Sequence, residues 1–310
     1  MNPQLNATPE NSSAQRNATS ATSPTRPLYW SIRRELWEVR SIYVAPLAVA
    51  GVFLLGFLFY LHKLPASVRA ALPPQAMEQR EALVQPFDYA AVSIMGIAFI
   101  VSLLYSLEAL YAERRDRSTL FWKSLPVSDR TTVLAKASIP LLVVPVVCCA
   151  VTFALQAMML GLSSLVLLAS GLSPAILWSS LSFLPSFFYL LYHIFTVHVL
   201  WYAPIYAWLL LLSAWARRAP LLWAVVPPLA IGIFEQLVFH SAYFRSFLGS
   251  RLSGGPEMDS SSMDGGFPFH HGVHLTPGHF LMSPGLWIGL LFAAGFLWAA
   301  ARIRRYREPV

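Results

Sequence analysis

Residues 137–216 read ASIPLLVVPVVCCAVTFALQAMMLGLSSLVLLASGLSPAILWSSLSFLPSFFYLLYHIFTVHVLWYAPIYAWLLLLSAWA and contain no Lys, Arg, Asp or Glu. A helix that crosses a bilayer needs about 20 mostly apolar residues, so this stretch is long enough for two crossings with a connection, or for three. With 56% hydrophobic and only 12% charged residues, the chain is predicted to be an all-α membrane protein. Four further apolar segments can each span a membrane: Ile42–Leu61, Phe87–Tyr111, Pro220–Phe239 and Pro284–Ala301.

The distribution of Lys and Arg decides how often the long stretch crosses. If it crosses twice and the N-terminus is cytoplasmic, 17 of the 22 Lys and Arg residues lie on the cytoplasmic side, as the positive-inside rule requires. Three crossings would move Arg217, Arg218 and the basic C-terminus to the other side. The sequence therefore predicts six transmembrane helices with both termini in the cytoplasm. The two crossings are placed at Ser138–Met159 and Ser186–Leu212, and Gly161–Pro185 is predicted to form short helices in the outer leaflet.

The segments around the spans differ in character. Residues 1–26 are rich in Asn, Ser, Thr, Ala and Pro and are predicted to be a disordered cytoplasmic tail. Residues 27–40 combine apolar residues at helical spacing with Trp30, Trp37 and three Arg, a pattern typical of a helix lying in the membrane interface. Residues 241–283 form the predicted periplasmic loop. The chain has no basic helix and no aromatic–basic repeat, so it offers no surface for nucleic acid.

The loop between the second and third spans reads ERRDRSTLFWKSLPVSDR from Glu113 to Arg130. It joins a dense charge cluster to an apolar patch and ends in a helix-capping Ser128. Charged residues beside an apolar patch suit a surface that binds a partner protein. The apolar patch consists of Leu120, Phe121, Trp122 and Leu125.

This loop, with a Lys shortly after it (Lys136), resembles the permeases of ABC-2 type transporters, and the resemblance extends over residues 27–307. It implies a six-helix permease domain in the bacterial inner membrane, in which residues 112–132 form a cytoplasmic coupling loop. It also implies two copies of a separate ATPase subunit and a second permease copy or a paralogue. The residues that would transmit closure of the ATPases to the membrane helices are Glu113, Arg115, Leu120, Phe121, Leu125 and Pro126.

The chain has no GxxxxGK[ST] motif, so any ATP and Mg²⁺ would be bound by the partner ATPase and no cofactor by this chain. The spans supply few charges, which favours export of an amphipathic or lipid-like substrate. Two alternatives stay open. One is an intramembrane enzyme that handles metal or protons through His193, His198 and Glu235. The other is a membrane scaffold that transports nothing.

Several other residues carry weaker expectations. Glu108 is expected to snorkel to the interface or to form a local pair. The adjacent Cys148 and Cys149 are expected to be small packing residues. In the outer loop, His270, His271, His274 and His279 could bind Zn²⁺ or Cu²⁺, or belong to a mobile gate. The small residues Gly285, Gly289 and Ala293 recur at every fourth position and would let a neighbouring helix approach closely.

Overall fold

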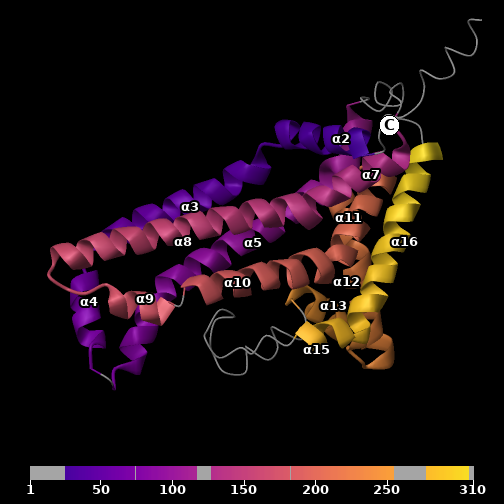
Figure 1. Cartoon of the computed structure of the whole chain (residues 1–310). Coiled ribbons are helices and arrows are strands. Elements are labelled where there is room, and N and C mark those ends of the chain that lie inside the picture. The colour runs from indigo at the N-terminus through magenta and orange to yellow at the C-terminus, as the bar shows by residue number, and fades with distance from the viewer. Residues whose placement is uncertain (1–24, 74, 117–126, 182, 255–276, 307–310) are drawn as a thin grey trace, which may run out of the picture.

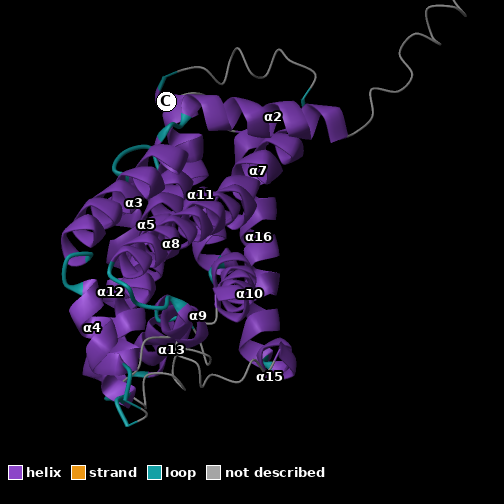
Figure 2. Cartoon of the chain, turned by 60° about the vertical axis from the view of Figure 1, so that its left-hand side comes forward, coloured by secondary structure: helices purple, strands orange, loops and turns teal. Residues whose placement is uncertain are grey.

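The computed structural model describes residues 25–73, 75–116, 127–181, 183–254 and 277–306, and every element within them is a helix. Short loops and turns join most of these helices (Figure 2). The first half contains α2 (Thr25–Glu38), α3 (Ser41–Tyr60), α4 (Leu64–Ala71), α5 (Met77–Arg115), α7 (Asp129–Ser138), the π-helix η1 (Ile139–Val143), α8 (Val144–Ala169) and α9 (Ala175–Leu181). The second half contains α10 (Phe183–His193), the π-helix η2 (Ile194–Trp201), α11 (Ala203–Trp215), α12 (Pro220–Phe239), α13 (Tyr243–Leu252), α15 (Pro277–Met282) and α16 (Pro284–Tyr306).

Five of these helical segments are long and apolar enough to cross a membrane. They are α3, α5, the continuous stretch Asp129–Ala169, α12 and α16. A sixth is gained if the pair Phe187–Trp201 and Ala203–Trp215, which bends by 44°, counts as one span. The described part of the chain is therefore all-helical, and its five or six potential spans indicate a membrane-embedded protein.

The boundaries of two spans differ from the predicted ones. α8 does not end near Met159 but continues through Gly161 to Ala169, so the first part of the predicted segment Gly161–Pro185 belongs to this long helix and only α9 is a separate short helix there. A single glycine inside an apolar helix weakens it by only about 1 kcal/mol and does not end it. The turn comes at Gly171, whose φ of +70° is readily adopted only by glycine among common residues. α5 is also longer than the predicted span and runs to Arg115, so the connection to α7 is shorter than the predicted loop 112–132.

The helices extend away from one shared end of the molecule. α3, α5 and α8 run side by side from the end that carries α2 and α7, while α16 leaves the same end in another direction (Figure 1). α11 packs against both α5 and α16 and so joins the two groups. Residues of α3, α5 and α8 form most of the main hydrophobic core, which includes the buried Cys148.

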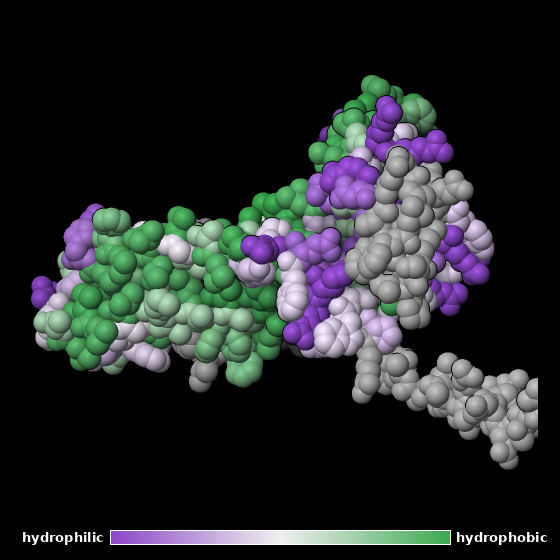
Figure 3. Space-filling model, turned by 90° about the horizontal axis from the view of Figure 1, so that it is seen from above, coloured by the Kyte–Doolittle hydropathy of each residue, from purple (hydrophilic) through white to green (hydrophobic). Residues whose placement is uncertain are grey.

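The outer surface of the helices is strongly apolar. Seen from above, the arm built of α3, α5 and α8 is largely hydrophobic (Figure 3). Hydrophilic residues gather at the end of the molecule from which these helices extend. α12 has no buried residue at all, although it is among the potential spans. A helix that is apolar all round and is not covered by other helices of the protein suits a lipid environment.

Candidate functional site

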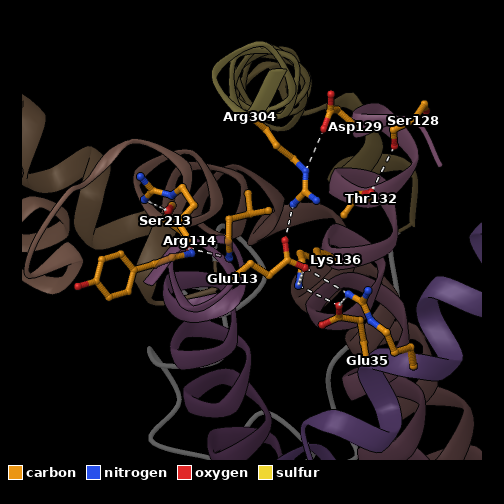
Figure 4. Close-up of polar contacts among 12 residues, drawn as sticks. Glu35, Glu113, Arg114, Ser128, Asp129, Thr132, Lys136, Ser213 and Arg304 are labelled. Carbon is orange, nitrogen blue, oxygen red and sulfur yellow. Dashed lines mark hydrogen bonds and ion pairs between the residues drawn. The ribbon is translucent and has the colours of Figure 1, made fainter. Parts of the chain in front are cut away.

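A group of charged side chains is buried at the end of the molecule that α2, α7 and the C-terminal part of α16 share (Figure 4). Glu113, two residues before the end of α5, accepts hydrogen bonds from Arg304 Nη1 at 2.5 Å and forms an ion pair with Lys136 Nζ at 3.1 Å. Lys136 Nζ also donates to Glu35 Oε1 at 2.8 Å. We call these four residues, together with Arg34 and Asp129, the charge cluster.

Arg34 and Asp129 extend the charge cluster at its two edges. Arg34 Nη2 lies 2.7 Å from Glu35 and 3.2 Å from Glu113. Arg304 Nε donates to Asp129 Oδ1 at 3.1 Å, so its guanidinium bridges α5 and α7. Three carboxylates thus face three cations, and buried charges are tolerated when they are paired in this way.

The central members are almost completely removed from solvent. Glu35, Glu113, Lys136 and Arg304 are between 2% and 8% exposed. Because two ions must lose water to form a buried pair, such a pair adds little stability over an apolar substitute. Removing one partner is different, since it leaves the other charge buried without compensation. An arrangement of α2, α5, α7 and α16 that separated these side chains would leave charges buried without partners and would be strongly disfavoured.

Glu35 remains ionised in this setting. Burial by itself raises the pKa of its carboxyl group. The charge of Lys136 opposes that effect, and hydrogen bonds from Lys136, Tyr105 and Arg34 add to the opposition, so the net pKa lies below the ordinary value. The Tyr105 hydroxyl donates to Glu35 Oε2 at 2.7 Å, which satisfies the second oxygen.

The start of α7 positions its two members of the charge cluster. Ser128 is the N-cap: its Oγ accepts from the N–H of Thr131 at 3.1 Å, and its carbonyl accepts from the Thr132 hydroxyl. This cap fixes the first turn, which contains Asp129. Lys136 follows Asp129 by seven residues, two helical turns, so both side chains lie on the same face of α7. The capping signal in the sequence is therefore confirmed.

A neighbouring polar contact attaches α11 to the same part of α5. Arg114 Nη2 donates to the carbonyl oxygens of Ser213 at 2.7 Å and Ala216 at 2.6 Å, at the C-terminal end of α11. A cation there complements the helix dipole. The Ser213 hydroxyl oxygen also lies 3.0 Å from the Leu110 N–H and 2.9 Å from the Tyr111 N–H of α5. The end of α5 is thereby bonded to four other helices.

The predicted coupling residues fall into three groups. Glu113 is 7% exposed and makes its contacts within the chain. Arg115 is exposed and forms a 3.1 Å ion pair with its neighbour Asp116. The others, Leu120, Phe121, Leu125 and Pro126, lie outside the described residues.

Glu35, Lys136 and Arg304 were not predicted as site residues. In the sequence, Arg304 is one of several positive charges in the basic C-terminus, and Lys136 is only the Lys that follows the loop motif. One signal was available for Glu35: it lies between Ile32 and Leu36, both of which pack against the hydrophobic core. A carboxylate on the apolar side of a helix needs a cationic partner, but the sequence does not identify that partner.

The two histidines predicted to lie within the membrane lie close together, apart from Glu235. His193 and His198 are buried, and their ring centroids are 6.4 Å apart. His198 Nε2 is 3.4 Å from the carbonyl oxygen of Met95 on α5. Both histidines border or belong to the π-helical segment η2, and π-helical segments are frequent at functional sites.

Glu235 serves a local purpose instead. Its carboxylate accepts from the Ser241 hydroxyl and from the N–H groups of Tyr243 and Phe244, so it caps the start of α13. Glu108 is exposed and lines a small cavity of about 120 Å³ beside Glu35. No group of three or more potential metal ligands occurs among the described residues. Of the outer histidines, His270, His271 and His274 lie outside them, and His279 belongs to α15 with its side chain undescribed.

The stripe of small residues on α16 receives two different neighbours. Ala293 packs with Ala203 and Ala207 of α11, which agrees with the predicted close approach of a helix. Gly285 and Gly289 instead accommodate the side chain of Arg251 from α13.

Comparison of the chain with models of protein families, with curated protein sequences and with solved structures found no match.

Proposed function

We propose that this protein is the membrane-spanning permease subunit of an ABC-2 type exporter, driven by a separate ATPase and moving an amphipathic or lipid-like substrate. One observation carries the proposal: both ends of the connection between α5 and α7 are bonded into the charge cluster. Glu113 lies at the end of α5, and Asp129 is the first residue of α7. Arg304 of α16 binds both of them.

This arrangement suits the transmission of a force. A partner that pushes on residues 117–126 displaces the end of α5 and the start of α7. Because Lys136 holds Glu35 and Glu113 at 2.8 Å and 3.1 Å, α2 must move with them. Packed elements tied by buried ion pairs move as rigid bodies rather than deforming continuously. A small displacement of the connection would therefore reach α2, α16 and, through Arg114, α11.

The orientation belongs to the same proposal. The end that carries the charge cluster faces the cytoplasm of a bacterial inner membrane, six spans are formed, and both termini lie on that side. α2 lies along the interface, with Trp30 and Trp37 exposed and Arg33 stacked on both rings at 5.2 Å and 5.1 Å. Exposed Trp beside Arg is typical of helices at the headgroup level.

The partners are those that the resemblance to ABC-2 type permeases implies. Two ATPase copies bind ATP and Mg²⁺ and dock on the connection through Leu120, Phe121, Leu125 and Pro126. A second permease copy or a paralogue completes the transport path.

The test is purification of the tagged protein from its own membranes in mild detergent, with copurifying chains identified and ATP hydrolysis measured. The expected result is a stoichiometric P-loop ATPase that is lost from the double variant Leu120→Ser/Leu125→Ser. Leu72→Ser is the matched control, because Leu72 is an equally apolar residue, 54% exposed, just after α4. Retention of the ATPase by the Leu120/Leu125 variant, or its absence from the wild-type preparation, would refute the proposal.

A second candidate function rests on the histidine pair. Two buried histidines 6.4 Å apart at a π-helical segment suit a site that takes up a metal ion or a proton within the membrane. Elemental analysis of the purified protein decides this. A stoichiometric transition metal that is lost from His193→Gln/His198→Gln, in a preparation without ATPase, would favour an intramembrane enzyme.

A further inference from the structure

A second polar feature lies beside the charge cluster, on the outer side of Asp129. A cavity of about 300 Å³ opens between the first turn of α7 and the last turns of α16. Three arginines line it, Arg130 from α7 and Arg302 and Arg305 from α16. A volume of this size lies at the lower end of the range of about 300–1,000 Å³ that small-molecule sites occupy.

The three arginines form no ion pair with any carboxylate in the described parts of the chain. The acidic residue in the cavity wall is Asp129, and its carboxylate accepts from Arg304. The described lining of the cavity is therefore strongly positive. Three like charges around one space repel each other, and an anion placed between them removes that repulsion.

Two of the guanidinium groups are held by aromatic rings. Arg302 lies 5.2 Å from the ring centroid of Trp298 and 5.5 Å from that of Tyr306. Arg305 lies 5.7 Å from the Tyr306 ring. Stacking of this kind limits the conformations of the side chains, so less entropy is lost when they bind a ligand.

The surface next to the cavity is apolar. Trp298 is 59% exposed, and Leu291, seven residues earlier on the same face of α16, is 74% exposed. The face of α16 thus continues from arginines at the helix end to apolar side chains along the predicted span. This order of charge and apolar surface matches a lipid, with its headgroup at the arginines and its acyl chains along the helix.

We propose that this cavity binds the phosphate group of an anionic phospholipid from the surrounding membrane. Arginine recognises phosphate through paired N–H donors in one plane, and Arg130, Arg302 and Arg305 present such donors from two helices. The bound headgroup links the start of α7 to the end of α16, in parallel with the Asp129–Arg304 contact. The proposal goes beyond the exporter function and does not depend on an ATPase.

Titration of the purified full-length protein in detergent tests the site. The probes are dioctanoyl-phosphatidylglycerol, dioctanoyl-phosphatidylcholine and inorganic phosphate, each followed by calorimetry at constant ionic strength. Saturable binding is expected for phosphatidylglycerol and not for phosphatidylcholine. The variant Arg302→Gln/Arg305→Gln should bind phosphatidylglycerol roughly tenfold more weakly or worse, because two charge-assisted contacts are lost.

The matched control is Arg217→Gln/Arg218→Gln. It removes the same charge from two exposed residues in the connection between α11 and α12, away from the cavity lining. If both double variants bind phosphatidylglycerol equally weakly, the lipid is attracted by the overall positive charge of the protein, and the proposed site is overturned. So would equal binding of phosphatidylglycerol and phosphatidylcholine. Tight binding of inorganic phosphate alone would identify a soluble phosphate as the ligand and overturn the lipid source.

The single variant Arg130→Gln keeps the test informative if the α16 variant does not fold. Arg130 is exposed and lies on the other wall of the cavity. Its substitution should also weaken phosphatidylglycerol binding, whereas unchanged affinity would contradict the proposed site.

Discussion

Arg251 of α13 lies against Gly289 of α16 so closely that a Cβ atom on residue 289 would stand 2.5 Å from Nη2 and 2.9 Å from Cζ of the arginine. The guanidinium has little freedom to move. Its Nη1 donates to the carbonyl oxygen of Trp201, its Nη2 donates to that of Gly285, and its Cζ lies 4.0 Å from the Trp201 ring centroid. Gly289 thus makes room for a buried cation that holds α13 on η2 and α16.

The first prediction is that Gly289→Ala lowers thermal stability in detergent. The added methyl group must displace Arg251 from its hydrogen bonds, at a cost of about 1–3 kcal/mol for an overpacked site. Gly295→Ala in the same helix is the control, since no heavy atom lies within 4 Å of a Cβ there. It should be neutral or slightly stabilising, because alanine favours a helix. If both variants unfold at the same temperature, the contact has been misinterpreted.

Gly289→Ala should cost little stability in a chain that already carries Arg251→Ala. The smaller side chain at position 251 relieves the crowding, so the two substitutions should be non-additive. The measurement is a double-mutant cycle of thermal unfolding temperatures. Strict additivity would mean that the two residues do not interact.

Glu35→Gln should destabilise the protein far more than Glu38→Gln. Glu35 is buried, and its loss leaves Lys136 without one of its two carboxylate partners, which costs about 3–5 kcal/mol for a broken buried pair. The Glu38 side chain is 63% exposed and lies 3.7 Å from Arg34, a pair worth at most about 1 kcal/mol. Unfolding in denaturant measures both. Similar losses of unfolding free energy in the two variants would show that the buried ion pair of Glu35 contributes no more stability than the exposed pair of Glu38.

The pH dependence of stability should carry the signature of Glu35. Its pKa in the folded protein is lowered from the ordinary value of 4.5, so between these two values the unfolded chain binds the proton and the folded chain does not. The stabilisation is therefore complete above about pH 4.5 and is lost as the pH falls through the folded pKa. In Glu35→Gln this decrease should be smaller. An unchanged acid transition in that variant would assign the transition to other carboxyl groups.

The predicted topology is tested by cysteine labelling in right-side-out membrane vesicles. Ala70→Cys on α4 should react with an impermeant maleimide, whereas Ser128→Cys should react only after the vesicles are opened, because the two positions lie at opposite ends of the predicted spans. Both positions are exposed. The native Cys148 and Cys149 are buried, so the background is low. Labelling of both variants in intact vesicles would contradict the six-span arrangement.

The sequence alone determined the fold class, because a long uncharged segment can satisfy its backbone within a membrane only as helices. Residues 137–216 established this without any knowledge of contacts. It also located α3, α12 and the start of α16, whose ends coincide with Pro residues or with the limits of uncharged runs. The Ser128 cap was predictable for the same reason, since capping depends on neighbours in the chain.

Only the tertiary structure decided how the charged residues are used. Glu35 and Lys136 are 101 positions apart in the chain, and Glu113 and Arg304 are 191 apart. No local pattern links such residues, because each lies on a helix whose rotation and neighbours are set by packing. For the same reason the sequence assigned Gly285 and Gly289 to helix packing, whereas in the folded chain they receive Arg251. The strength of an ion pair depends on distance and burial, and both quantities come into existence only when the helices assemble.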